Sequence, residues 1–192
     1  MDTHLIPLLL ALVSGIAIAA ACGLRAFLPL LTLGLAARFG VLHLRPGAEW
    51  MAGDPALWAL GIATVLEILS DKVPVIDHAL DAVGTLIRPA AAWLGAFAVL
   101  QGWGSPWAQI AALVLGAGAL AVHGVKAKTR LGSTVATAGH ANPLLSIVED
   151  SGVLVLVALA IFVPLLALGL ILLAVWWVGR WRRGRAPATL TP

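Results

Sequence analysis

The sequence contains a single cysteine, Cys22, among its 192 residues. One cysteine excludes an intrachain disulfide bond and any zinc or iron–sulfur site built from several cysteines. Its position beside a glycine in an apolar segment indicates a small packing residue. Charged residues are also scarce: they make up 11% of the chain, whereas 61% of the residues are hydrophobic. A soluble domain of this length could not bury so much apolar surface, so the composition predicts an integral membrane protein.

The motifs of several common enzyme classes are absent. The chain has no nucleotide-binding glycine loop, no nucleophile elbow and no H-E-x-x-H zinc motif. Its net charge of +3 comes mainly from the tail, because four of the twelve basic residues lie among the last thirteen positions. The other eight nearly balance the nine acidic residues. This distribution indicates a near-neutral membrane core and gives no support for nucleic-acid binding.

Apolar stretches cover about residues 5–37, 56–70, 79–102, 107–122 and 152–178. At roughly 20 residues per crossing, they predict an all-α polytopic transmembrane bundle of about five spans. We expect one domain, residues 1–179, followed by a basic tail, residues 180–192.

Three prolines interrupt this pattern. Proline lacks an N–H group, so Pro29 favours a kink or break at Arg25, Pro74 favours one at Ser70, and Pro89 is expected to end the charged helix before it. Interrupted apolar segments beside charges are typical of broken or re-entrant helices that line a cavity.

Two short motifs each occur twice. Cys22–Ala26 resembles His123–Ala127, with a cation at the same place after the glycine, and Glu67–Asp71 loosely matches Ser146–Asp150. The matches leave open an internal duplication with halves at residues 1–104 and 105–179. If such halves pack as pseudo-symmetric repeats, we expect the cations Arg25 and Lys126 to approach the acids Asp71 and Asp150.

The C-terminal end predicts the orientation of the chain. An aromatic belt of Trp176, Trp177 and Trp181 overlaps the basic residues of the tail, and this pattern is typical of a cytoplasmic end. Five simple crossings then place Lys126, Lys128 and Arg130 on the outer side, against the positive-inside rule. Either these three side chains are buried in the bundle, or residues 131–150 cross or re-enter the membrane.

Residues 67–89 hold four acids, a lysine, a histidine and an arginine between apolar runs. Inserting a charged side chain into lipid costs roughly 2.5–3.5 kcal/mol of free energy on insertion scales. Charged residues between apolar runs therefore indicate a functional site. On a helix, Asp77, Asp81 and Arg88 share one face. They could bind a cation, relay a proton or neutralise each other, and Arg88 could instead hold an anionic substrate. The alternative is an amphipathic segment whose charged face lies in the headgroup layer.

His78 lies beside Asp77 and is a candidate proton carrier or, with the two aspartates, a metal ligand. Farther along the chain, His123, Lys126 and Arg130 share a helical face, and Lys128 points away from it. These basic groups form either an anion site or an interface anchor.

Asn142 before a proline indicates a turn or helix N-cap, and Ser146 three residues before Glu149 fits a capping box. Asp150, just before a long apolar stretch, has no such explanation.

Four of these motifs together resemble a known family. They are Gly23–Pro29, the charged residues from Glu67 to Pro89, Lys126–Arg130, and Asn142–Asp150. The resemblance is to a family of small bacterial membrane proteins catalogued as domain of unknown function forty-one twenty-six. It covers about residues 10–165. It implies a compact helical membrane domain, and it brings no activity, substrate or catalytic residue. Together with the basic tail it predicts a multi-pass protein of the bacterial inner (plasma) membrane with a cytoplasmic C-terminus.

The leading hypothesis is a small transporter or channel-like permease with a buried charged site. Arg25, Arg88 and Lys126 would hold an anionic group, and the acids would handle a coupling proton or cation. The alternatives are a metal-dependent enzyme acting on lipid phosphates, with Mg²⁺ held by Asp77 and Asp81, and a scaffold or assembly protein with structural salt bridges. The sequence favours a non-enzymatic role. It predicts no cofactor beyond this divalent cation.

The expected partners are the lipid bilayer and an unidentified small solute or ion, with a homodimer left open. The candidate binding residues are Arg25, Asp71, Lys72, Asp77, His78, Asp81, Arg88, His123, Lys126, Arg130, Asn142, Glu149 and Asp150.

Overall fold

The computed structural model describes residues 5–70 and 74–183, with side chains described outside residues 71–82 and 181–183. Throughout these residues the regular structure is helical. The elements are α1 (Leu5–Leu24), α2 (Phe27–Arg38), the short 3-10 helix η1 (Glu49–Ala52), α3 (Asp54–Ser70), α4 (Pro74–Val99), α5 (Trp107–Thr137), α6 (Asn142–Phe162) and α7 (Pro164–Arg183). The predicted all-α class is confirmed.

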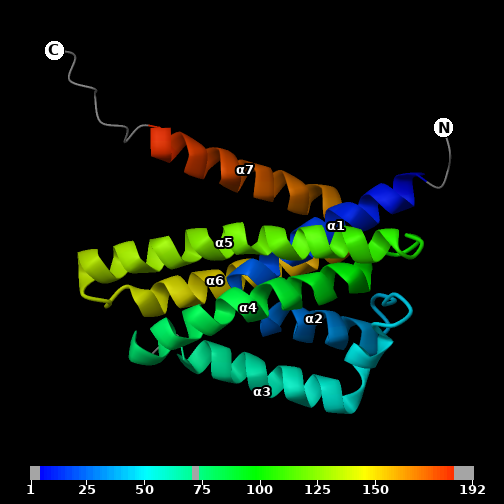
Figure 1. Ribbon diagram of the computed structural model, residues 1–192, viewed down its shortest axis with the longest axis horizontal. Coiled ribbons are helices and arrows are strands. Elements are labelled where there is room, and N and C mark those ends of the chain that lie inside the picture. Colours follow the sequence, from blue (N-terminus) through cyan, green and yellow to red (C-terminus); the bar gives the residue numbers. More distant parts are fainter. Residues whose placement is uncertain (1–4, 71–73, 184–192) are drawn as a thin grey trace.

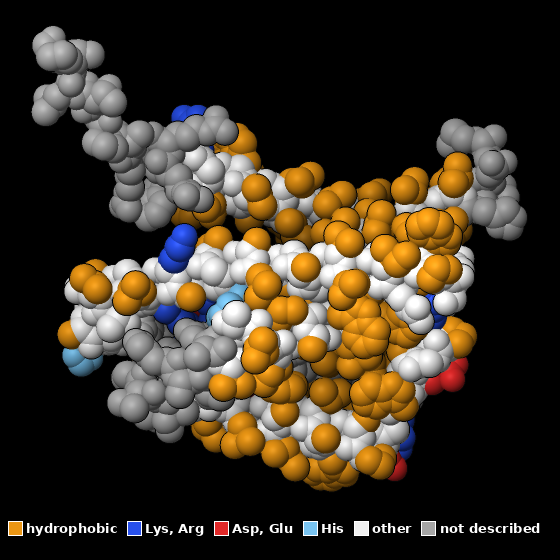
Figure 2. Space-filling model, in the orientation of Figure 1, with side chains coloured by type: hydrophobic (Ala, Val, Ile, Leu, Met, Phe, Trp, Pro, Cys, Tyr) orange, Lys and Arg blue, Asp and Glu red, His pale blue; other side chains and the backbone are white. Residues whose placement is uncertain are grey.

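Three of the described helices, α1, α5 and α6, are long and apolar enough to cross a membrane. Shorter apolar helical segments, Phe27–Arg38, Val83–Val99 and Pro164–Arg180, accompany them. Large hydrophobic side chains such as Trp58, Leu113 and Leu165 are more than 60% exposed, and Figure 2 shows hydrophobic side chains over much of one face. Lipid tails solvate such a surface, so these helices fit a membrane protein.

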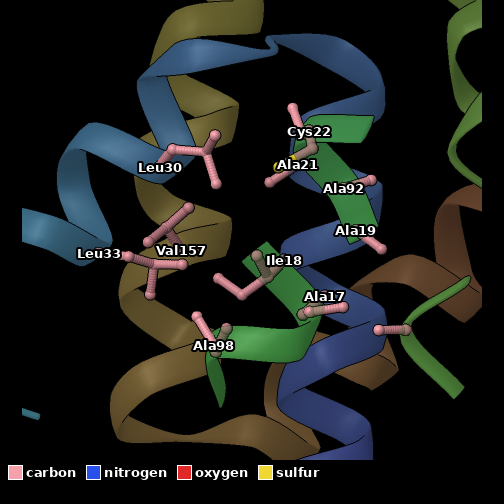
Figure 3. Close-up of a cluster of buried hydrophobic side chains, with 14 of the residues drawn as sticks. Ala17, Ile18, Ala19, Ala21, Cys22, Leu30, Leu33, Ala92, Ala98 and Val157 are labelled. Carbon is pink, nitrogen blue, oxygen red and sulfur yellow. The ribbon is translucent and has the colours of Figure 1, made fainter. Parts of the chain in front are cut away.

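α1 is the central helix of the bundle. It contacts α4, α5, α6 and α7, whereas α3 packs mainly against α2 and lies at the edge of the bundle (Figure 1). The close packing depends on small residues along α1, since helices in lipid associate where their backbones approach. Figure 3 shows Ala17, Ala19, Ala21 and Cys22 of α1 in the core between α2, α4 and α6. Cys22 is fully buried there, as its sequence position predicts.

The break predicted from Pro29 is confirmed. α1 ends at Leu24, and the chain leaves the helix at Arg25 and Ala26 before α2 begins at Phe27. α2 then packs against α3 and α6. The interruption therefore places a non-helical pair of residues inside the bundle, where only neighbouring protein groups can satisfy the backbone.

The prediction for Pro89 and the prediction of one continuous segment over residues 152–178 are both wrong. Pro89 does not end a helix: α4 continues through it to Val99. α4 packs along both α1 and α5, and Gly116 of α5 lies directly against the Pro89 carbonyl, so tertiary contacts support the helix across the proline. Conversely, the last apolar stretch, 152–178, is not one helix. It divides at Val163, because Pro164 cannot continue the hydrogen bonding of α6 and instead begins α7.

The division at Val163 also adds a helix, α7, that the apolar stretch had joined to α6. The start of α1 and the C-terminal end of α7 lie at opposite ends of the bundle, and the α5–α6 connection lies at the same end as the C-terminal end of α7 (Figure 1). Of the three cations for which the sequence left burial in the bundle open, Lys126 and Arg130 are buried and Lys128 is exposed. The compartments on the two sides stay a prediction.

A glycine substitution tests the central packing. A methyl group on Gly23 would lie 2.7 Å from the backbone oxygen of Ala119 and 2.7 Å from Cβ of Val122, whereas the Cβ of an alanine at Gly124 would meet no atom within 4 Å. Gly23→Ala should lower the free energy of unfolding by about 1–3 kcal/mol through overpacking. Gly124→Ala should be neutral or raise it by up to about 1 kcal/mol, because alanine favours helix. Unfolding of both variants in detergent gives the comparison, and equal effects would contradict the close approach of α1 to α5.

Candidate functional site

Arg25 lies in the break between α1 and α2, and its side chain is completely buried. Its Nε atom is 2.7 Å from Oδ1 of Asp150, and its Nη2 group donates a hydrogen bond of 2.8 Å to Oγ of Ser146. Both partners lie on α6, four residues apart and therefore on one helical face. Arg25 thus meets one of the two acids expected of it, and Ser146, which sequence reasoning assigned to a helix cap, is its second partner.

Glu149 is the second acid of the cluster and bridges two cations of α5. Arg130 donates to both carboxylate oxygens, from Nε at 3.2 Å and from Nη2 at 2.7 Å. Lys126 Nζ lies 3.3 Å from Oε2, and Arg25 Nη2 lies 3.9 Å from the same oxygen. Only 14% of the Glu149 side chain is exposed, so water screens these pairs weakly. The three cations and two acids form one continuous charged cluster, defined here as Arg25, Lys126, Arg130, Glu149 and Asp150.

The broken backbone between α1 and α2 is satisfied by side chains from other helices. Lys126 donates a 3.0 Å hydrogen bond to the carbonyl of Leu24, the last residue of α1. Glu67 of α3 accepts hydrogen bonds from the N–H groups of Ala26 and Phe27, at 2.8 and 3.1 Å. A cation at a helix C-terminus and a carboxylate at a helix N-terminus are both favoured by the helix dipole. Sequence reasoning did not select Glu67, although it is the only acid in the stretch 56–70.

The paired motifs of the proposed duplication have different local structures. Arg25 lies at a helix break, whereas Lys126 lies inside the continuous helix α5. His123, Lys126 and Arg130 lie on the predicted common face of α5, and all three are buried, which the sequence had left open. The duplication itself stays a prediction. The two cations that follow the glycines of the paired motifs, Arg25 and Lys126, lie in different local structures.

Arg88 and His123 connect α4 to α5. The guanidinium group of Arg88 contacts Nδ1 of His123, and both side chains are buried. The predicted alternative partner, Asp81, lies outside the described side chains, as do Asp71, Lys72, Asp77 and His78. Their roles stay predictions.

The capping interpretation of residues 142–149 is wrong. α6 begins at Asn142, its N-cap Ala141 makes no side-chain hydrogen bond, and Ser146 and Glu149 lie inside the helix. Asn142 instead donates a 2.9 Å hydrogen bond to Oγ1 of Thr134 and so connects the start of α6 to α5. The helix begins one turn earlier than a capping box at Ser146 requires, because Pro143 occupies a favourable first-turn position.

The charged cluster lies deep within the bundle. α6 has 21 residues, so its length of about 31 Å matches the hydrocarbon thickness of a bilayer. Asp150 is the ninth of these residues, about 12 Å along the helix axis from its first residue. Charges at this depth are costly unless they are paired, which explains why both acids lie against cations.

A family model for Domain of unknown function (DUF4126) matches residues 12–183. The chain belongs to this family. The match includes α1 from residue 12 on, the break at Arg25, the cations of α5 and the acids of α6, so the whole charged cluster lies in the DUF4126 domain. Neither a curated protein nor a solved structure matches the chain.

In the part of this DUF4126 protein that the structure describes, no group of three or more His, Cys, Asp or Glu side chains could hold a metal ion. Glu149 and Asp150 are engaged with arginine and lysine instead. The predicted divalent-cation site depends on Asp77 and Asp81, whose side chains lie outside this part, and it stays a prediction.

Proposed function

We propose that this protein is a small membrane transporter that moves an anionic solute through the charged cluster. The observation that carries the proposal is the position of Arg25, which is fully buried at a helix break and paired with an acid in the depth of α6. Ion pairs at this depth are the usual components of solute and proton pathways in membrane proteins. Helix breaks beside such charges are typical of solute sites near the bilayer midplane.

The pairing suggests how the site would exchange its ligands. Arg25 contacts the carboxylate of Asp150 and the hydroxyl of Ser146, and Lys126 and Arg130 share the carboxylate of Glu149. A solute carboxylate or phosphate could replace the Asp150 carboxylate on Arg25, since both bind a guanidinium group through the same geometry. A proton taken up by Asp150 at the same time would keep the net charge of the site unchanged for a solute that carries one negative charge.

We further infer that the protein lies in the bacterial inner (plasma) membrane with its C-terminal end in the cytoplasm. The end of α7 supports this orientation, because the Arg180 guanidinium lies 5.6 Å from the centre of the Trp176 ring. Aromatic and basic side chains together favour the headgroup layer on the cytoplasmic side.

The transport proposal is tested by flux into proteoliposomes. Radiolabelled phosphate, succinate and lactate are the probes, and Arg25→Gln and Asp150→Asn are the variants. If one probe is carried, each variant should slow its uptake by about tenfold or more, since a hydrogen bond to a charged group is worth about 1.5–3 kcal/mol. Arg38→Gln is the matched control, because Arg38 forms an exposed pair with Asp54 at the same distance, 2.7 Å. Saturable uptake that is unchanged in Arg25→Gln would contradict the proposal.

A structural scaffold is the second candidate, and it is favoured by the internal compensation of the cluster, in which both acids already contact cations. A scaffold needs only that the charges remain paired. Exchanging them in the double variant Arg25→Asp/Asp150→Arg should then preserve folding and assembly. Under the transporter proposal the same exchange should abolish uptake, because the cation moves from the helix break to α6.

A further inference from the structure

A cavity of about 140 Å³ lies at the end of the bundle away from the charged cluster. Its lining includes Ser14 and Ile18 of α1, His43 of the α2–η1 connection, Gln101 after α4, and Ala160 of α6. His43 and Gln101 are exposed at its mouth, whereas Ile18 is completely buried and forms its inner wall. The volume is sufficient for several water molecules, and the hydroxyl, imidazole and amide groups provide hydrogen-bonding partners for them.

The cavity and the charged cluster lie on the same helix–helix seam. At one end Ser14 Oγ donates a 2.8 Å hydrogen bond to the carbonyl of Ala160, and at the other Arg25 meets Asp150. Ser14 and Ile18 lie at i and i+4 on one face of α1, and Arg25, the first residue after the helix, follows at i+11 in the same helical register. The separation of eleven residues corresponds to about 16 Å along the helix axis. The seam between α1 and α6 therefore connects a solvent-facing cavity to the buried charges.

Between these polar ends the seam is apolar. Ile18 of α1, Leu33 of α2 and Val157 of α6 are completely buried in the same hydrophobic cluster. Figure 3 shows Leu33 and Val157 next to each other, with Ile18 on the facing helix. Val153, one turn nearer to Asp150, is also fully buried. These buried apolar side chains, contributed by three helices, lie between the cavity and Arg25.

We propose that the cavity is the entrance to the charged cluster and that Ile18, Leu33 and Val157 form a hydrophobic gate between them. An apolar constriction excludes water and ions until its side chains separate, which is an established way of closing a membrane pathway. The inference rests on the proposed transport function and adds the route and the closing element. The helix break at Arg25 gives α2 a separate connection to α1, so Leu33 can move away from Ile18 without unwinding either helix.

Cysteine accessibility tests the gate without measuring transport. In a Cys22→Ala background, Ser14→Cys places a thiol in the cavity and Val153→Cys places one beyond the gate. The probe is the membrane-impermeant anion methanethiosulfonate ethylsulfonate, applied to proteoliposomes. Ser14→Cys should react readily, and Val153→Cys should react at least about tenfold more slowly because water is excluded from its site. Adding Ile18→Ala should bring the reaction rate of Val153→Cys close to that of Ser14→Cys.

Two controls separate gating from general loosening. Ile62→Ala makes the same change on the exposed face of α3 and should leave Val153→Cys protected. Ala112→Cys, at a fully buried position of α5, should stay unreactive when Ile18→Ala is added. If Ile18→Ala does not fold, the smaller change Val157→Ala decides the test.

Three results would contradict the gate proposal. Ser14→Cys could be unreactive, Val153→Cys could react readily in the Cys22→Ala background, or neither Ile18→Ala nor Val157→Ala could raise the reaction rate of Val153→Cys. The proposed function fails by a different result, namely absence of uptake for every probe while the accessibility pattern holds.

Discussion

Replacing Asp150 with alanine should lower the free energy of unfolding by about 3–5 kcal/mol, the usual cost of removing one partner from a buried ion pair. Arg25 has no exposed surface, and Asp150 Oδ1 is 2.7 Å from its Nε atom. Without that carboxylate, the bundle has to hold a guanidinium charge with less compensation, far from water. Thermal and denaturant unfolding in detergent micelles measure the loss.

The matched control is Asp54→Ala. Asp54 lies 2.7 Å from Arg38, but 71% of its side chain and 48% of that of Arg38 are exposed. Exposed pairs contribute about 0–1 kcal/mol, so this variant should unfold nearly as the parent does. Equal losses for Asp150→Ala and Asp54→Ala would show that Arg25 is not buried as described.

A double variant then separates stability from function. Arg25→Met/Asp150→Leu removes both charges, and hydrophobic pairs of similar volume often restore or exceed the stability of a buried ion pair. We expect this variant to fold and to carry no solute. A stable double variant with normal activity would instead assign the pair to structure alone.

Replacing Glu149 with glutamine should have an effect of similar size, about 3–5 kcal/mol, because one carboxylate serves two buried cations. Arg130 contacts both of its oxygens, and Lys126 lies 3.3 Å from one of them. Glutamine keeps the shape and one acceptor oxygen but loses the charge, so Lys126 and Arg130 would repel each other with less compensation. The loss of stability in this variant therefore reports the contribution of the Glu149 charge and not that of its side-chain volume.

The pairing of Glu149 with Lys126 is measured by a double-mutant cycle. If Lys126→Met relieves part of the repulsion, the double variant Lys126→Met/Glu149→Gln should be more stable than the sum of the single effects predicts, by about 0.5–3 kcal/mol. Lys128→Gln is the control, since Lys128 is exposed two residues away on the same helix. Additive effects of the first pair would contradict a shared carboxylate.

Much of the architecture could be predicted because it depends on local chemistry. The scarcity of charge indicated a membrane protein, and the missing N–H of Pro29 indicated the break at Arg25. Helical periodicity placed His123, Lys126 and Arg130 on one face, which the structure shows to be buried, and Lys128 outside it. Each of these conclusions uses residues within a few turns of one another, where the geometry of a helix is fixed.

The errors have a common physical cause. Pro89 and Pro164 are the same residue type, yet α4 continues through one and the chain turns at the other. The difference lies in the neighbouring helices, which support α4 on two sides. Likewise, Glu149 fits a capping box by spacing, but α6 begins earlier and the carboxylate is drawn to Lys126 and Arg130.

Local sequence pattern is sufficient to establish that this chain is apolar and helical, where its first helix breaks, and which side chains bring charge into the bundle. Which charges meet depends on how the helices pack. Arg25 and Ser146 are 121 residues apart, and Glu67 reaches the start of α2 across 41 residues. An unpaired charge in the bundle is costly wherever it lies, so every cation needs a partner, but the partner is selected by helix packing and not by spacing along the chain.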